Sequence, residues 1–299
     1  MPLAVFLALA LVAAVRPVSA QGFEALGTRA QGMGGAFVAV ADDASAVYWN
    51  PAGLGTGATV DAQIEVGRQE RVFAGLAIPS LGLSYWRLPT VLVSGGRQEE
   101  GSGEVRLGVF RTTNFGVTFV QTIVNGIVVG STMRLVRGEV GTAGARTAFD
   151  LDAGMMASAG SVRVGLTARN LRHPEFAVAG LSQGVSLDRQ VRLGVALVPR
   201  TRPAGIHGPF SIAVDLDLTK STLESGQQKE LAVGGEYWWA AGRLGTRGGL
   251  RFNTLGEHDR VGSAGVTVGL PRSIFIEGQM TKGRQDTRNN WGISARVTF

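Results

Sequence analysis

The sequence predicts an all-β protein, a transmembrane antiparallel β-barrel of about fourteen strands, from two observations. The first is strict alternation along the last strand, residues 289–299, whose apolar face carries Trp291, Ile293, Ala295, Val297 and Phe299. The second is that the same period of two recurs upstream, for example over 162–169, 191–197 and 211–219. An apolar row backed by a polar row fits a wall with lipid on one side and a water-filled lumen on the other.

The amino terminus carries the only long apolar run, Leu3 to Val15. This run is shorter than the roughly 20 residues that a spanning helix needs. Small residues at Ser19 and Ala20 suit cleavage before Gln21, so we interpret residues 1–20 as a secretory signal peptide. A short anchor helix is the alternative interpretation.

Composition limits the classes of function. The 299 residues carry a formal charge of +6, and removing residues 1–20, which include one Arg, leaves +5. The remaining length fits one barrel domain. The absence of Cys excludes disulfides, thiolate metal sites and Cys nucleophiles. The Arg residues are spread along the chain and form no basic run, so nucleic-acid binding has no local support.

Alternation and turn signals together place fourteen strands, an even number as expected for a bacterial single-chain barrel. Most short connections alternate with longer ones such as Pro89 to Gly103, which predicts short periplasmic turns and longer outer loops, and Arg200 to Pro209 is the exception. The predicted strands are 59–67, 72–78, 81–88, 104–122, 126–137, 147–158, 162–171, 191–198, 210–219, 230–239, 243–253, 261–270, 273–281 and 290–299.

Charged residues occupy the inward positions, with acidic strands beside basic ones. We expect Asp150 and Asp152 to face Arg163 and Arg169, Arg192 to face Asp215 and Asp217, Glu236 to lie one strand from Arg243, Arg247 and Arg251, and Glu277 to lie one strand from Arg296. These ladders either brace a narrow lumen or form an electrostatic constriction on a substrate route.

A Gly-rich apolar segment precedes the first strand and has the character of an internal plug. We assign residues 21–57 to this hatch and 58–299 to the barrel. Asp42 or Asp43 is expected to cap a short helix through Ala44 to Trp49, and Pro51 to stop it. The candidate hatch and gating residues are Gly32, Gly34, Gly35, Asp42, Asp43, Tyr48, Trp49, Asn50, Pro51, Ala52, Gly53 and Leu54.

The runs Gly-Met-Gly-Gly-Ala, Ala-Asp-Asp-Ala-Ser-Ala and Trp-Asn-Pro-Ala-Gly-Leu resemble the amino-terminal hatch of the FadL and PorV/PorQ outer-membrane proteins over roughly residues 26–55. The terminal Phe299 resembles the insertion signal by which bacterial barrels address the barrel-assembly machinery. The resemblance implies a fourteen-stranded barrel in the bacterial outer membrane with an internal hatch, in which Asn50, Pro51 and Ala52 belong to the plug.

The resemblance covers branches with different functions. FadL-like members carry long-chain fatty acids and other hydrophobic compounds, and PorV-like members bind the carboxy-terminal domain of a secreted protein in type IX secretion. We expect passive uptake of hydrophobic small molecules gated by the hatch, with the secretion role and a structural barrel without transport as alternatives. Strand glycines Gly75, Gly82, Gly116 and Gly130 fit either a wall opening or close packing.

An enzyme and a soluble β-sandwich are the remaining alternatives. The three histidines His173, His207 and His258 fall in predicted connections and no nucleophile motif accompanies them, so we expect no catalysis. No residue pair has the spacing of a metal site, and we expect no metal and no cofactor. The signal peptide, the terminal Phe299 and an aromatic girdle at residues 237–239 favour the membrane barrel over the sandwich.

Overall fold

The computed structural model describes residues 18–19, 26–94, 106–140, 144–176, 185–199, 210–223, 226–256, 259–284 and 289–299. The predicted signal peptide, apart from Val18 and Ser19, lies outside these ranges, as do its cleavage site, His207 and His258. Within the described part of the chain, no helix is long and apolar enough to cross a membrane.

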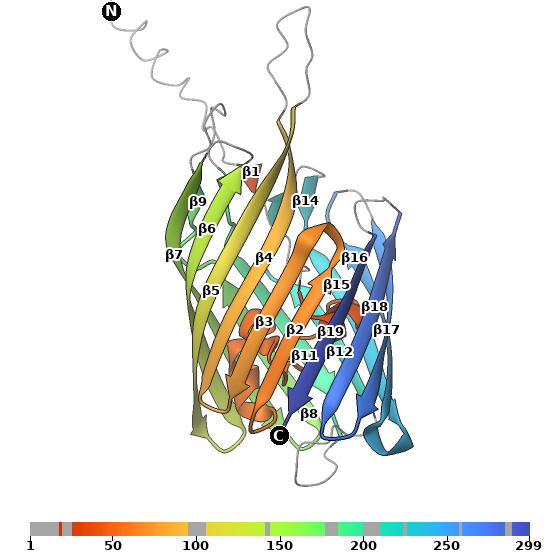
Figure 1. Ribbon diagram of the computed structural model, residues 1–299. Helices are drawn as coiled ribbons and strands as arrows, with labels where there is room; N and C mark the ends of the chain where they lie inside the picture. Colours follow the sequence, from red (N-terminus) through yellow and green to blue (C-terminus); the bar gives the residue numbers. More distant parts are fainter. Residues whose placement is uncertain are drawn as a thin grey trace, which may run out of the picture.

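Fourteen antiparallel strands form a closed barrel (Figure 1), which confirms the predicted fold class. They follow one another around the wall in chain order, and the last strand pairs with the first to close it. The barrel strands are β2 Asp61–Gly67, β3 Arg71–Ile78, β4 Leu81–Ser94, β5 Arg106–Val124, β6 Ile127–Val140, β7 Ala145–Ala159, β8 Val162–Arg169, β11 Gln190–Leu197, β12 Phe210–Asp217, β15 Glu230–Trp239, β16 Leu244–Asn253, β17 Arg260–Leu270, β18 Ile274–Gly283 and β19 Asn290–Thr298.

The side chains that alternate in the sequence point alternately to the outer and the inner face of the barrel wall. On β19 the outward Ile293 is 52% exposed, whereas the inward Ser294 is 2% exposed. The same division separates the exposed apolar residues of other strands from buried charged ones. The outer surface is therefore suited to lipid and the inner surface to polar contacts.

One strand is much longer than predicted. We expected β4 to end at Leu88, but it continues past Pro89 to Ser94. The last pair between β3 and β4 is Val72 with Arg87, so beyond it β4 is bonded only to β5. A proline is tolerated there because one side of the strand has no ladder hydrogen bond to lose.

The two ends of the barrel differ. Phe299 and most of the described short turns lie at one end of the barrel, which we call the turn end, and we call the opposite end the loop end (Figure 1). Two of the short connections contain one-turn 3₁₀ helices, η2 Arg68–Glu70 at the loop end and η3 Ala240–Gly242 at the turn end. The loop end is assigned to the outside of the cell, because bacterial barrels have short turns on the periplasmic side and longer loops on the extracellular side.

Small sheets cover part of the loop end. β9 Glu175–Phe176 pairs antiparallel with β10 Val185–Ser186, and β1 Val18–Ser19 pairs parallel with β10. β13 Ser221–Leu223 and β14 Gly226–Gln228 form a hairpin. An apolar cluster ties the first of these sheets to the barrel, and it contains Phe110, Val136, Phe176, Val185 and Leu187.

The amino-terminal segment, residues 26–56, lies inside the barrel, and we call it the hatch (Figure 1). Its elements are α2 Thr28–Gly32, α3 Ala46–Trp49 and the 3₁₀ helix η1 Pro51–Thr56. Residues 26–41 and 43–54 are buried throughout. The principal core cluster of the protein consists mainly of hatch residues packed on the inner wall.

Candidate functional site

The chain reverses after α2 at two glycines. Gly34 and Gly35 have φ angles of +70° and +81°, in the left-handed region that favours glycine. A β-carbon at Gly34 would also lie 2.9 Å from the backbone nitrogen of Leu250, which is on β16. The turn is therefore fitted against the wall as well as to its own backbone angles.

α3 is shorter than expected and its cap differs from the prediction. The helix begins at Ala46. Asp43 accepts hydrogen bonds from the backbone nitrogen of Ser45 at 2.9 Å and from its hydroxyl at 2.5 Å, just ahead of the helix. Asp42 is not a cap, because its carboxylate contacts Arg29 at 2.6 Å. Pro51 ends α3, as the sequence predicts, and opens η1 at once.

Asn50 joins three parts of the structure. Its side-chain nitrogen donates to the carbonyl of Val38 at 2.9 Å and to that of Met155 on β7 at 3.1 Å. Its side-chain oxygen accepts from the nitrogen of Ala52 at 3.2 Å and so caps η1. One side chain thus holds both halves of the hatch to each other and to the wall.

Arg29, on α2, is the charged centre of the hatch and was not among the candidate residues. Two of its nitrogens donate to Glu236 of β15 at 2.8 and 2.9 Å, and a third reaches Asp42 at 2.6 Å and Asp43 at 3.2 Å. Burial lowers the pKa of Arg29, but these carboxylates raise it by more, so the pKa lies well above its usual value. A lone Arg in an apolar Gly-rich segment is the signal that could have identified it.

Aromatic residues of α3 pack against arginines of the wall. The guanidinium of Arg169 lies 3.6 Å from the ring centroid of Tyr48, and that of Arg192 lies 6.0 Å from the centroid of Trp49. Trp49 also donates to the carbonyl of Leu26 at 2.9 Å. These contacts give buried cations an attractive surface as well as a charged partner.

Wall carboxylates accept hydrogen bonds from the hatch backbone. Asp215 accepts from the nitrogens of Phe37 and Val38, both at 2.8 Å. Asp61 on β2 accepts from the nitrogen of Ala44 at 2.8 Å. Because the hatch lacks strand partners, its buried backbone donors need side-chain acceptors, and these carboxylates supply them.

Glu65, on the same strand as Asp61, adds to this set of wall acceptors. Glu65 accepts from the nitrogen of Thr28 at 2.7 Å, at the start of α2. Ser263 donates to the carbonyl of Gly32 at 3.1 Å, and the side chain of Asn290 donates to Gln31 at 2.6 Å. Sequence reasoning did not single out Asp61 or Glu65, although both stand at inward positions of β2.

Glycine pairs on neighbouring strands make room for the hatch backbone. Gly130 of β6 is opposite Gly154 of β7, with η1 against both. A β-carbon at Gly130 would lie 2.5 Å from the carbonyl carbon of Pro51, and one at Gly154 would overlap Asn50. The close-packing interpretation therefore describes Gly130 better than a wall opening does.

Two further pairs repeat this arrangement around the wall. Gly165 of β8 is opposite Gly194 of β11, and Gly234 of β15 is opposite Gly249 of β16. A β-carbon at Gly165 would lie 2.5 Å from the carbonyl oxygen of Val38, and β-carbons at Gly234 and Gly249 would overlap Met33. The hatch and the inner wall are thus shaped for each other at three places.

The remaining lumen charges pair partly as expected. Asp152 lies 3.8 Å from Arg169, and Arg192 binds Asp217 at 2.5 Å. Glu277 binds Arg296 at 3.2 Å. Arg251 lies 3.4 Å from Glu230, which was not among the candidates.

Other charged residues have different partners from those expected. Arg163 lies 3.7 Å from the hatch residue Asp42, not beside Asp150 or Asp152. Those two aspartates instead bind Arg134 of β6, which the sequence reasoning missed. Glu236 is the register partner of Arg247 on the next strand, as expected, but it lies 3.9 Å from the Arg247 guanidinium and makes its shorter contacts with Arg29 of the hatch.

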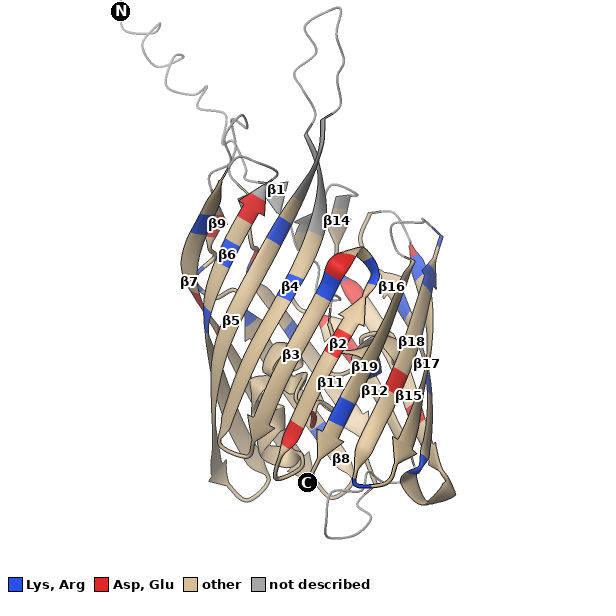
Figure 2. Ribbon diagram, in the orientation of Figure 1, with Lys and Arg blue, Asp and Glu red and all other residues tan. Residues whose placement is uncertain are grey.

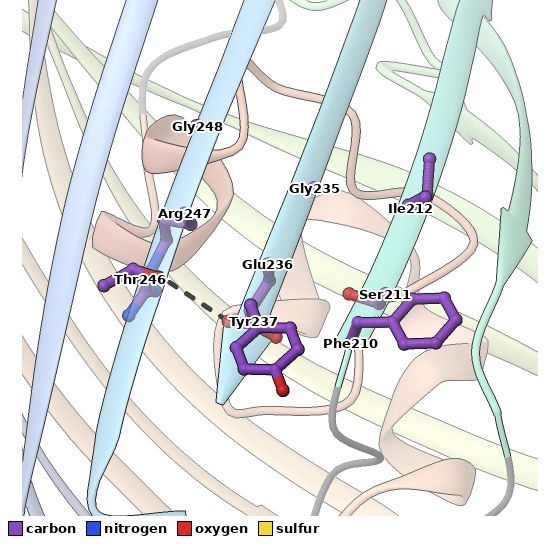
Figure 3. A pocket seen from close by; sticks show the side chains of 9 residues that line it. All are labelled: Phe210, Ser211, Ile212, Gly235, Glu236, Tyr237, Thr246, Arg247 and Gly248. Carbon is purple, nitrogen blue, oxygen red and sulfur yellow. Dashed lines mark ion pairs between the residues drawn. The ribbon is translucent and has the colours of Figure 1, made fainter. Parts of the chain in front are cut away.

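A hollow of about 420 Å³ lies on the outer side of the wall, behind the strand that carries Glu236 (Figure 3). Its floor is formed where Gly235 of β15 is opposite Gly248 of β16, with Ile212 on the next strand. Phe210 and Tyr237 stand at one end of the hollow (Figure 3). Trp238, which we expected in the aromatic girdle, points inward and is 7% exposed.

Fold and interior together define a closed transmembrane β-barrel whose lumen is occupied by its own amino-terminal segment. The toluene transporter TodX of Pseudomonas putida has a similar structure, with a TM-score of 0.62 and 11% sequence identity over 94% of this chain and 98% of that chain. A deltaS2 mutant of the TodX monoaromatic hydrocarbon channel gives a TM-score of 0.62 at 12% identity, over 93% and 100% of the two chains. The fold that we expected from the FadL resemblance is confirmed.

Sequence comparisons add less. The sequence model of the family described as "F plasmid transfer operon, TraF, protein" matches residues 141–217, from β7 into β12 and less than half of the chain. No curated protein matches the sequence. The likeness to TodX at this level of identity establishes the fold and leaves the activity to be argued from the site.

Proposed function

We propose that this protein is a passive outer-membrane channel for hydrophobic small molecules and that the hatch is its gate. The observation that carries the proposal is an apolar strip on the inner wall that the hatch covers. On β3 and β4, Phe73 is opposite Trp86, and both are fully buried beneath the hatch together with Ala77 and Leu88. The rest of the described inner wall is rich in paired charges.

The apolar strip suits a hydrophobic substrate better than the paired charges of the remaining wall do. Moving an apolar molecule past buried ion pairs gains little, whereas contact with Phe73 and Trp86 recovers the free energy of apolar burial, about 25 cal/mol per Å². In the resting state the hatch occupies this surface, with Tyr48 5.8 Å from Trp86 between ring centroids. Displacing the hatch uncovers the strip and opens the lumen in one movement.

The contacts of the hatch with the wall suit a part that moves. Besides the apolar packing, they are side-chain hydrogen bonds and ion pairs, such as Asp215 with Phe37 and Glu236 with Arg29, and no strand of the barrel pairs with the hatch. Breaking them leaves every ladder of the barrel in place. The fold of TodX, a hydrocarbon channel by its description, supports the same assignment. Long-chain fatty acids and aromatic hydrocarbons are the first substrates to test.

An engineered disulfide tests the gate directly, because the native chain has no Cys. A β-carbon at Gly75 of β3 would lie 3.2 Å from the β-carbon of Ala44, close to the usual disulfide range of about 3.5–4.5 Å. It would also lie 2.6 Å from the ring of Phe73, which must rotate to make room. The variant Ala44→Cys/Gly75→Cys thus locks the hatch to the strip that it covers.

The assay is uptake of radiolabelled oleate and toluene by proteoliposomes. Uptake by the oxidised double variant is expected to fall to the level of empty liposomes, and reduction with dithiothreitol is expected to restore it. Neither treatment should change uptake by the single-Cys variants. Equal uptake by the oxidised and reduced double variant would contradict hatch gating. No uptake by any form would favour a structural barrel, and a stoichiometric secreted protein that co-purifies would favour the PorV-like secretion role.

A further inference from the structure

The lipid-facing wall near the loop end carries a cluster of arginines that the transport proposal does not use. Arg87 on β4, Arg111 on β5 and Arg137 on β6 alternate with the buried lumen residues of their strands, so they belong to the outer face. Figure 2 shows basic residues on these neighbouring strands toward the loop end. Arg172, just after β8, is exposed and lies 5.6 Å from the ring centroid of Phe149.

The strand register places the arginines directly above an apolar, aromatic row. Tyr85, Phe115, Leu135 and Phe149 are register partners on β4, β5, β6 and β7. The rings of Tyr85 and Phe115 are 5.0 Å apart between centroids. Arg87 and Arg137 stand two residues further along their strands toward the loop end, which is about 7 Å measured along the strand.

This order matches the section of a lipid leaflet. Aromatic side chains collect where acyl chains meet headgroups, and guanidinium groups just beyond them lie at the depth of headgroup phosphates. Arginine also binds phosphate in a bidentate manner, through two parallel N–H donors.

The cluster is only partly neutralised by the protein. Glu70 accepts from Arg111 at 3.1 Å, and Glu139 accepts from Arg137 at 2.7 Å. Within the described residues no carboxylate pairs with Arg87, and the Nε atoms of Arg87 and Arg111 are shielded from water without a hydrogen-bond partner. Four guanidinium groups and two carboxylates leave an excess of positive charge and of unused donors.

We infer that this surface, which we call the arginine belt and define as Arg87, Arg111, Arg137 and Arg172, binds the phosphate groups of a phosphorylated glycolipid of the outer leaflet, of the lipid A type. The acyl chains lie along the aromatic row, and the phosphates accept hydrogen bonds from the arginines. The belt is a lipid site on the outside of the barrel, so it is independent of the hatch and of what passes through the lumen.

Native mass spectrometry of the full chain in mild detergent tests the belt, with diphosphoryl lipid A as the probe and fully dephosphorylated lipid A as the matched lipid. The test variant is Arg87→Gln/Arg111→Gln/Arg137→Gln. The control variant is Arg260→Gln/Lys282→Gln, which removes exposed charges at the same end from β17 and β18. Heat-modified mobility on gels verifies that all forms are folded barrels.

Wild type and the control variant are expected to bind diphosphoryl lipid A, and the test variant to bind it at least about tenfold more weakly, as the loss of one charge-assisted phosphate contact requires. Dephosphorylated lipid A should bind wild type as weakly as the phosphorylated form binds the test variant. Equal binding of the two lipids by wild type, or an equal loss in the control variant, would overturn the inference.

Discussion

A single β-carbon added to the inner wall is expected to release the hatch without opening the barrel. In Gly130→Ala the new carbon would lie 2.5 Å from the carbonyl carbon of Pro51 and 2.6 Å from the nitrogen of Ala52. Ordinary contacts begin near 3.4 Å, so η1 must retreat by about 0.9 Å. Both neighbours are backbone atoms, which cannot rotate away as a side-chain tip does.

The cost falls on hatch docking. Overpacking of this kind costs roughly 1–3 kcal/mol. A destabilisation of that size raises the undocked population of the hatch roughly five- to 150-fold. The matched control is Gly278→Ala on the outer face of β18, where a β-carbon would meet nothing within 4 Å. Both changes place alanine in a strand interior, so intrinsic strand preference cancels between them.

Hydrogen exchange measured by mass spectrometry separates hatch from wall. Peptides within residues 26–56 of Gly130→Ala should exchange faster by that factor, while peptides from β12 to β19 keep wild-type protection. The Gly278→Ala variant should match wild type in both regions. If the hatch of Gly130→Ala exchanged at the wild-type rate, or if the wall lost protection equally, the close-packing argument would be refuted.

Three other changes address the charged centre, the polar clamp and the terminal residue. Arg29→Met removes the close cation of Glu236 and leaves it only Arg247 at 3.9 Å, so the hatch should lose roughly 3–5 kcal/mol of docking free energy, seen as rapid proteolysis within it, and Arg29→Lys should lose less. Asn50→Ala removes three hydrogen bonds worth about 1 kcal/mol each and should speed hydrogen exchange in the hatch, and Asn50→Asp should speed it at least as much, because its carboxylate would face the carbonyl oxygens of Val38 and Met155. Phe299→Ala should slow assembly in cells through the barrel-assembly machinery yet leave the refolded protein's urea midpoint unchanged, since Phe299 is 73% exposed; a lowered midpoint would make its role structural.

The strands were predictable because the period of two reports a local fact, namely which face of the wall a residue occupies. Each of the fourteen predicted strands has its counterpart in the barrel, with boundaries shifted by a few residues in most cases. The extension of β4 past Pro89 was missed because the end of a neighbouring strand, not the proline itself, decides whether proline is tolerated. Alternation carries no information about such edges.

Charge partners were less predictable because the sequence of the wall does not say what fills the lumen. Glu236 has an arginine on the adjacent strand, yet its short contacts are to Arg29, some 200 positions earlier in the chain. Arg163 is drawn to Asp42 in the same way. Neighbouring-strand rules rank only the partners within the sheet. The hatch inside the barrel competes for the same charged residues, and its docked position follows from packing at wall glycines such as Gly154.

The structure separates two kinds of stability, and this separation is what a gated barrel requires. The wall is a closed ladder in which every strand has two neighbours, so local opening of one strand exposes backbone groups on both sides and is resisted all the way around. The hatch has no ladder. It is held by side-chain contacts to carboxylates such as Asp61 and Asp215 and by close fit at glycine pairs, and each of these can be lost without breaking a wall hydrogen bond. Subglobal opening of residues 26–56 therefore lies below global unfolding in free energy. The uptake proposed for this chain needs this difference in free energy. It must be large enough that the barrel stays folded when the hatch opens, and the opening must be confined to the segment that covers Phe73 and Trp86.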